Sequence, residues 1–120
     1  MFDLSGKWHS IYQYHSGSGG RLFTYEHEII FKPHEQGFIG KSVREHDGSE
    51  VIIELQADER VFTGTWQEHT APKGHYHGKI FHGAIQLLLS EDGHELVGKW
   101  VGFNSGKNHV KAGDWRFRRL

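Results

Sequence analysis

The sequence predicts an all-β protein, an eight-stranded antiparallel up-and-down barrel that forms one domain over residues 1–120. Seven turn-forming segments recur at near-regular intervals and separate eight runs rich in aromatic and β-branched residues. These runs alternate with period two, and no stretch keeps a helical apolar period over three turns. Because short connections favour a meander and closure hides both edge strands, we expect the strands to form a barrel.

The predicted turns share glycine, proline, asparagine, aspartate or serine, the residues that favour tight turns. They cover residues 16–20, 33–37, 47–49, 58–60, 71–74, 91–93 and 104–108. Alternate residues of a strand point to the same side, so the parity of each run predicts an inward face. For the first four runs that face holds Leu4, Gly6, Trp8, Ser10, Tyr12 and Tyr14; Phe23, Tyr25, His27, Ile29 and Phe31; Phe38, Gly40, Ser42 and Arg44; Val51, Ile53 and Leu55.

The same parity predicts the inward face of three later runs. It holds Phe62, Gly64, Trp66 and Glu68; Leu96, Gly98 and Trp100; Trp115 and Phe117. The sixth run, residues 75–90, would extend roughly 50 Å as one strand, so we expect a bulge or a bend at Gly78 or Gly83. Its parity stays open: one choice turns Gln86 inward, and a shift by one residue turns Ile85, Leu87 and Leu89 inward instead.

All four tryptophans follow a glycine by two positions. The pairs are Gly6 and Trp8, Gly64 and Trp66, Gly98 and Trp100, and Gly113 and Trp115. Each glycine therefore shares the inward face with a large ring, and a tapered barrel interior needs this alternation of small and large residues. We expect most of these glycines to be structural.

Composition excludes several classes of protein. A net charge of −1 argues against a broadly basic nucleic-acid binder, and we expect no sequence-specific nucleic-acid partner. The absence of cysteine excludes disulfides, thiol nucleophiles and cysteine-ligated metal sites. No apolar run is long enough to cross a membrane, so no membrane partner is expected and a cytoplasmic location is the default.

Polar residues on the inward faces converge with tryptophan walls, a pattern typical of a small-molecule pocket. The candidate ligand-binding residues are Tyr12, Tyr25, His27, Arg44, Trp66, Glu68, Gln86 and Trp100. Unpaired buried charge is costly, so Arg44 and Glu68 must pair, meet solvent or meet a ligand. The leading hypothesis is a non-catalytic barrel, without a cofactor, that binds a polar ligand, in one version anionic or nucleotide-derived.

Three alternatives stay open. One is an enzyme, an isomerase or hydrolase that uses His27 or Glu68 as its base. Another is a haem- or metal-binding barrel, for which His75 and His77 are candidate ligands because they lie two residues apart; the acidic residue that such sites need nearby is absent, and no metal is predicted. The third is an interaction module or homo-oligomer that uses the basic segment 99–120, with six basic residues and one acidic.

Two motifs, Leu4-Ser5-Gly6-Lys7-Trp8 and Phe62-Thr63-Gly64-Thr65-Trp66, with an arginine-rich terminal strand, resemble the avidin and lipocalin group of calycin-type barrels. In that group an early Gly-x-Trp packs at the closed end of the barrel. The resemblance implies a ligand-binding barrel.

Residues 61–115 resemble, more closely, the β-rich C-terminal domain of some bacterial helix-turn-helix regulators. The likeness lies in Thr63-Gly64-Thr65-Trp66-Gln67-Glu68-His69-Thr70, Gly98-Lys99-Trp100-Val101-Gly102-Phe103 and Gly113-Asp114-Trp115. It implies a sensor role, although this chain lacks the DNA-binding helices. The predicted architecture is also similar to the ligand-sensing barrels of membrane-anchored anti-phage effectors that detect cyclic oligonucleotides, whose membrane helices this chain lacks.

Overall fold

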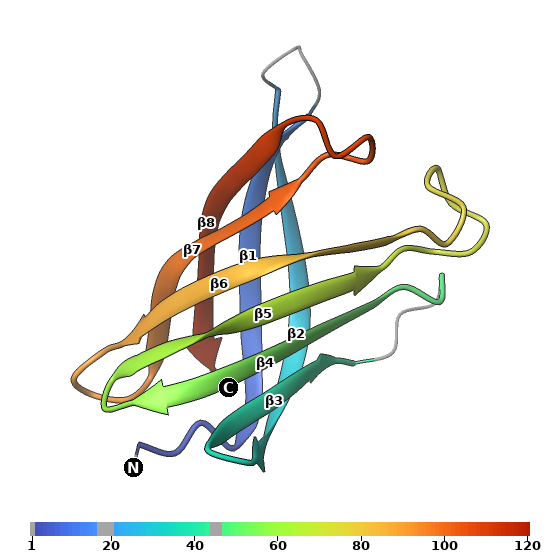
Figure 1. Ribbon diagram of the computed structural model, residues 1–120. Coiled ribbons are helices and arrows are strands. Elements are labelled where there is room, and N and C mark those ends of the chain that lie inside the picture. The colour runs from blue at the N-terminus through green and yellow to red at the C-terminus, as the bar shows by residue number, and fades with distance from the viewer. Residues whose placement is uncertain (1, 17–20, 44–46) are drawn as a thin grey trace.

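The computed structural model describes residues 2–16, 21–43 and 47–120. Eight strands follow one another along the chain: β1 (Gly6–Ser16), β2 (Arg21–His34), β3 (Gly37–Ser42), β4 (Glu50–Asp58), β5 (Val61–His69), β6 (Ile80–Leu89), β7 (Glu95–Phe103) and β8 (Val110–Arg119). Each strand pairs antiparallel with the next, and β1 pairs with β8, which closes the barrel (Figure 1). The predicted fold class is thus confirmed. The described residues include no helix long and apolar enough to span a membrane.

The interior is built from alternate residues of every strand, as the period-two pattern predicts. Its buried apolar side chains are Leu4, Trp8, Tyr12, Ile29, Phe31, Phe38, Val51, Ile53, Leu55, Phe62, Trp66, Ile85, Leu87, Leu89, Leu96, Trp100, Trp115 and Phe117. Seven of the eight inward faces therefore follow the predicted parity over the part of the chain that is described. Arg44, predicted at the end of the third inward face, lies outside the described residues.

The sixth strand resolves the parity that the sequence leaves open. Ile85, Leu87 and Leu89 are buried, whereas Gln86 is exposed and donates its Nε2 to Thr63 Oγ1 at 3.1 Å. The expected inward position of Gln86 is therefore wrong. The expected break in this run lies at Gly78, which has a φ of 78° in the loop formed by residues 70–79, and β6 begins only at Ile80.

One end of the barrel is closed by solid packing. Trp8 is 0% exposed, and its Nε1 donates to the carbonyl oxygen of Leu4 at 2.8 Å. The guanidinium of Arg119 lies 4.4 Å from the Trp8 ring centroid and donates to the carbonyl oxygens of Asp3, Ser5 and Gly93. Cation–π contact and three hydrogen bonds thus fix one arginine across the base of the barrel.

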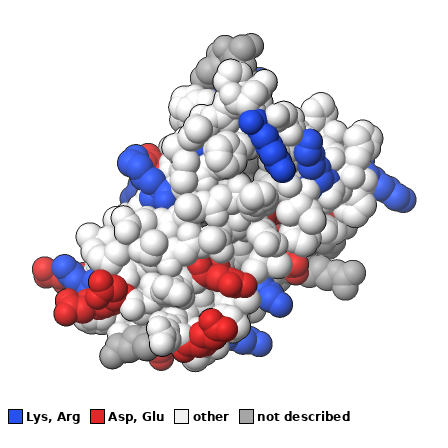
Figure 2. All heavy atoms as spheres, viewed as in Figure 1, with Lys and Arg blue, Asp and Glu red and all other residues white. Residues whose placement is uncertain are grey.

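The other end holds a cavity, and the loops that follow β5 and β7 contribute some of its lining residues. Strand β3 pairs only with residues 29–34 of β2, so residues 21–28 of β2 have β1 as their sole described strand neighbour. In Figure 1 the upper parts of β1 and β2 rise beyond β3 and β4. Figure 2 shows acidic side chains mainly over the lower half of this face, with some basic ones among them, and further basic side chains toward the upper right.

Candidate functional site

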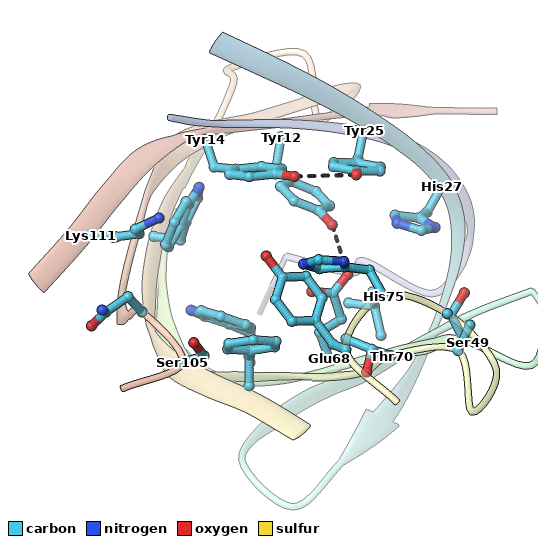
Figure 3. Close-up of a pocket in the computed structure, with 18 of the residues that line it drawn as sticks. Tyr12, Tyr14, Tyr25, His27, Ser49, Glu68, Thr70, His75, Ser105 and Lys111 are labelled. Atoms are coloured by element: carbon cyan, nitrogen blue, oxygen red, sulfur yellow. Dashed lines mark hydrogen bonds between the residues drawn. The ribbon is translucent and has the colours of Figure 1, made fainter. Parts of the chain in front are cut away.

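A cavity of about 660 Å³ occupies the open end of the barrel. Pockets for small molecules are usually of roughly 300–1,000 Å³. Its lining includes Tyr12, Tyr14, Tyr25, His27, Asp47, Ser49, Trp66, Glu68, Thr70, His75, Tyr76, Phe81, Trp100, Ser105, Lys111 and Trp115. Figure 3 shows that the labelled side chains come from opposite walls and point toward a common space.

Six of the eight predicted ligand-binding residues line this cavity. They are Tyr12, Tyr25, His27, Trp66, Glu68 and Trp100. Gln86 does not, since it lies on the outer face of β6. Arg44 and its predicted pairing with negative charge fall outside the described residues.

Two of the cavity's tryptophans are held by glycines on the next strand. Trp66 lies opposite Gly83 and donates Nε1 to the carbonyl oxygen of Val101 at 3.2 Å. Trp100 lies opposite Gly113 and donates Nε1 to the carbonyl oxygen of Gln13 at 3.0 Å. A Cβ on Gly83 would lie 2.8 Å from Trp66 Nε1, and one on Gly113 would lie 2.7 Å from Trp100 Nε1. These glycines therefore leave room for the indoles that form the wall.

The indole rings meet at the floor of the cavity. Trp66 and Trp100 have centroids 5.6 Å apart in an edge-to-face arrangement, and Trp115 lies 6.3 Å from Trp66. Trp115 is 2% exposed, and its Nε1 has no hydrogen-bond acceptor among the described residues. The other three indole nitrogens each donate to a backbone carbonyl.

Tyrosines of β1 and β2 form a second aromatic wall. The rings of Tyr14 and Tyr25 stack with centroids 5.4 Å apart, and Tyr12 stacks on Tyr25 at 5.6 Å and on His27 at 5.8 Å. The hydroxyl of Tyr14 donates to that of Tyr25 at 3.2 Å. Burial raises the pKa of Tyr14, and the hydrogen bond to Tyr25 raises it further. This wall therefore offers flat rings together with uncharged hydroxyl groups.

Glu68 is the carboxylate that projects into the cavity from β5. Its cross-strand neighbours are Val51 and Phe81, and the hydroxyl of Tyr12 donates to its Oε2 at 3.0 Å (Figure 3). Burial raises the pKa of Tyr12, and the negative charge of Glu68 raises it further. Tyr12 is therefore a neutral donor at physiological pH, and Glu68 lies in a half-buried, mainly apolar setting.

Several lining residues are missed by the sequence interpretation. Lys111 shares the inward parity of Trp115, a signal that could have found it, but the sequence groups it with the basic residues of segment 99–120. Thr70, Tyr76 and Ser105 lie in loops, where no periodicity indicates which side chains turn inward.

The histidine pair has a different setting from the one expected. His75 and His77 lie in the loop before β6, not on one face of a strand, and His77 has a φ of 52°. His75 lines the cavity and contacts the ring of Tyr76 edge-on at 4.8 Å. Across residues 2–16, 21–43 and 47–120, no group of three or more His, Asp or Glu side chains is arranged to hold a metal ion.

Chemically, the described lining combines stacking surfaces and hydroxyl donors with the carboxylates of Glu68 and Asp47 and the ammonium group of Lys111. No protein-family model matches the chain, and a search of curated proteins finds no relative for it. The chain is an eight-stranded antiparallel β-barrel with a cavity at its open end.

Proposed function

We propose that this barrel is a non-catalytic binding protein for a small polar ligand that contains a flat ring. The observation that carries the proposal is the cavity of about 660 Å³ at the open end, where aromatic walls meet a few inward polar groups. Such a lining is typical of small-molecule sites, in which apolar surface supplies affinity and polar groups fix orientation.

The rings supply the stacking surfaces. Trp66 and Trp100 line the cavity while only 8% and 7% exposed, and Tyr25 is 43% exposed at the mouth. Aromatic pairs contribute about 0.5–1.5 kcal/mol beyond the burial of area, so a flat ligand gains from entering this wall. The hydroxyls of Tyr12 and Tyr14 already hydrogen-bond within the cavity, which orients them before a ligand arrives.

The likeness to the calycin-type barrels is consistent with this proposal. Trp8 packs at the closed end, and an arginine of the last strand covers it. The opposite end is then the one available for a ligand. A sensor role, as the likeness of residues 61–115 to the regulator domain implies, is part of the same proposal.

The neutral fluorescent probe N-phenyl-1-naphthylamine tests the proposal, because its emission rises when it leaves water for an apolar site. We expect saturable binding at one site per chain. Trp66→Leu should lower the affinity at least about fivefold, since stacking is lost. The matched control is Gln86→Leu, which changes the outer face of β6 and should bind the probe as the wild type does.

Tyr25→Leu provides a second variant at the exposed mouth, in case Trp66→Leu does not fold. Circular dichroism and urea unfolding establish that each variant keeps the barrel. No saturable binding by the wild type, or equal affinity in Trp66→Leu, Tyr25→Leu and Gln86→Leu, would contradict the proposal.

A further inference from the structure

Two opposite charges face the same cavity without pairing with each other. Glu68 projects from β5 and Lys111 from β8, and Figure 3 shows them on different walls. Among the described residues, Glu68 forms no ion pair and accepts one hydrogen bond, from Tyr12. Lys111 Nζ donates to the carbonyl oxygen of His15 at 3.2 Å and likewise forms no described ion pair.

Glu68 has no counterion among the described residues, and most of its neighbours are apolar or aromatic. Val51 and Phe81 flank it across the sheet, and Trp66 lies two residues before it on the same inward face. Because Glu68 is half-buried beside apolar groups, a positive partner there is screened less than it would be on an open surface. Aromatic faces around it also attract cations.

The opposite lip of the cavity is positive. Lys79 Nζ donates to the carbonyl oxygen of Ser105, a lining residue, at 3.1 Å, so it lies beside the same lip as Lys111. Asp47 lies at the mouth just before β4, on the side of Glu68, with its Oδ1 accepting from the backbone N and Oγ of Ser49. Of these four described residues, the carboxylates of Asp47 and Glu68 therefore lie toward β4 and β5, and the ammonium groups of Lys79 and Lys111 lie toward β6 to β8.

The remaining titratable groups of the cavity do not remove this separation. Glu26 lies on the outer face of β2, with its Oε1 3.5 Å from His9 Nε2. His27 stacks on Tyr12, and His75 packs on Tyr76. Glu68 and Lys111 thus remain the charged side chains that face inward from the described strands.

We propose that the cavity selects a charge-separated ligand, a flat ring with a cationic group that docks at Glu68 and an anionic group that docks at Lys111. This inference rests on the proposed binding function and names the chemical class of its ligand. The ring lies between the tyrosine and tryptophan walls, and the two charges set its direction in the cavity. Complementary charge also suppresses the reversed orientation, in which like charges would meet.

Four ring probes of similar size separate the contributions: 4-(aminomethyl)benzoate carries both charges, benzylamine the positive one, benzoate the negative one and benzyl alcohol neither. Competition against N-phenyl-1-naphthylamine at pH 7.5 and low salt measures their affinities. We expect 4-(aminomethyl)benzoate to bind at least about tenfold more tightly than each of the others, as two charge-assisted contacts would give.

Two variants assign the charges. Glu68→Gln should weaken 4-(aminomethyl)benzoate and benzylamine about tenfold but leave benzoate unchanged, whereas Lys111→Met should weaken 4-(aminomethyl)benzoate and benzoate but leave benzylamine unchanged. Gln86→Ala is the control and should change none of the four. Urea unfolding confirms that each variant keeps the barrel.

If N-phenyl-1-naphthylamine binds, two results would overturn the charge-separated ligand. One is equal affinity for all four probes. The other is a preference for one singly charged probe that only one of the two variants abolishes. Absence of N-phenyl-1-naphthylamine binding would instead overturn the proposed function itself. The two failures are therefore distinguishable in one set of titrations.

Discussion

The Gly-x-Trp motif occurs at both ends of this barrel, but it borders filled space at one end and a cavity at the other. At the closed end, Gly-x-Trp places Trp8 among Phe31, Leu4 and Leu96, all at most 1% exposed, and the interior is filled. At the open end the same spacing places Trp66 and Trp100 at the border of a cavity. The motif therefore determines which face an indole takes, and its neighbours determine whether the space beside it is filled.

The neighbours differ for a structural reason. At the closed end, short turns join the strands: residues 35–36 connect β2 to β3 and residues 59–60 connect β4 to β5. Side chains from all around the barrel then meet, and Arg119 seals them. At the open end β3 stops at Ser42, and the loop over residues 70–79 stands at the rim. Loss of packing there is the condition for a cavity.

The largest expected difference between the ends is in stability. Trp8→Ala should lower the free energy of unfolding by about 3–5 kcal/mol, because it leaves a sealed void and removes the partner of Arg119. Trp66→Ala should cost less, by at least about 1 kcal/mol, since its site already borders open space. Urea unfolding of both variants measures the difference. Equal losses would show that the two ends are packed alike.

A smaller effect is expected from the glycine that leaves room for Trp66. Gly83→Ala should cost about 1–3 kcal/mol, because its new methyl group would overlap the Val101 carbonyl and crowd Trp66. The tryptophan emission spectrum should shift as well. Gly106→Ala is the control: its nearest atoms lie 3.7 Å or more away, so a change within about 0.5 kcal/mol is expected. Similar losses in both variants would remove the argument for close packing at Gly83.

Tyr12 lies between the closed end and the open end, and its titration measures how deeply its hydroxyl group is buried. Because its pKa is raised in the folded protein, the unfolded chain loses this proton first, at about pH 10. Its contribution to stability is complete below about pH 10 and should fall by about 1.4 kcal/mol per pH unit above it. Urea unfolding between pH 9 and 11.5 should show a shallower decline in Tyr12→Phe. Identical slopes in both proteins would mean that Tyr12 is solvated in the folded state.

The smallest effect is expected on the outer face. Gln86→Ala should change stability by no more than about 0.5 kcal/mol and leave probe binding intact, because its hydrogen bond to Thr63 is exposed. Loss of binding in this variant would place Gln86 at the ligand after all. Urea unfolding and the fluorescent probe measure both quantities.

The sequence predicts the closed end better than the open end. Regular alternation fixes the side on which Trp8, Ile53 or Phe117 lies, and packing follows from that side. The same parity predicts that Tyr12, His27 and Glu68 turn inward, but it does not reveal how much space is left between them. Cavity size depends on the length of β3 and on the conformation of the loops, and no periodic pattern in the sequence predicts either of them.

In the sixth strand, the alternation of residues alone does not predict which side chains point inward. Glycine and polar residues precede Ile80, so the start of β6 is not marked, and a shift by one residue exchanges Gln86 for Leu87 on the inner face. Thr70, His75 and Ser105 reach the cavity from loops, where no periodicity in the sequence marks the inward side chains. Lys111 is the exception, since its spacing of four from Trp115 indicates an inward position.

The central claim is that the open end binds a ligand and the closed end does not. The four indole N–H groups give four separate signals in a nitrogen–proton correlation spectrum, one from the closed end and three from the cavity. On addition of N-phenyl-1-naphthylamine, the signals of Trp66, Trp100 and Trp115 should shift in a saturable way, while that of Trp8 stays in place. Unchanged signals, or an equal shift of Trp8, would contradict the account.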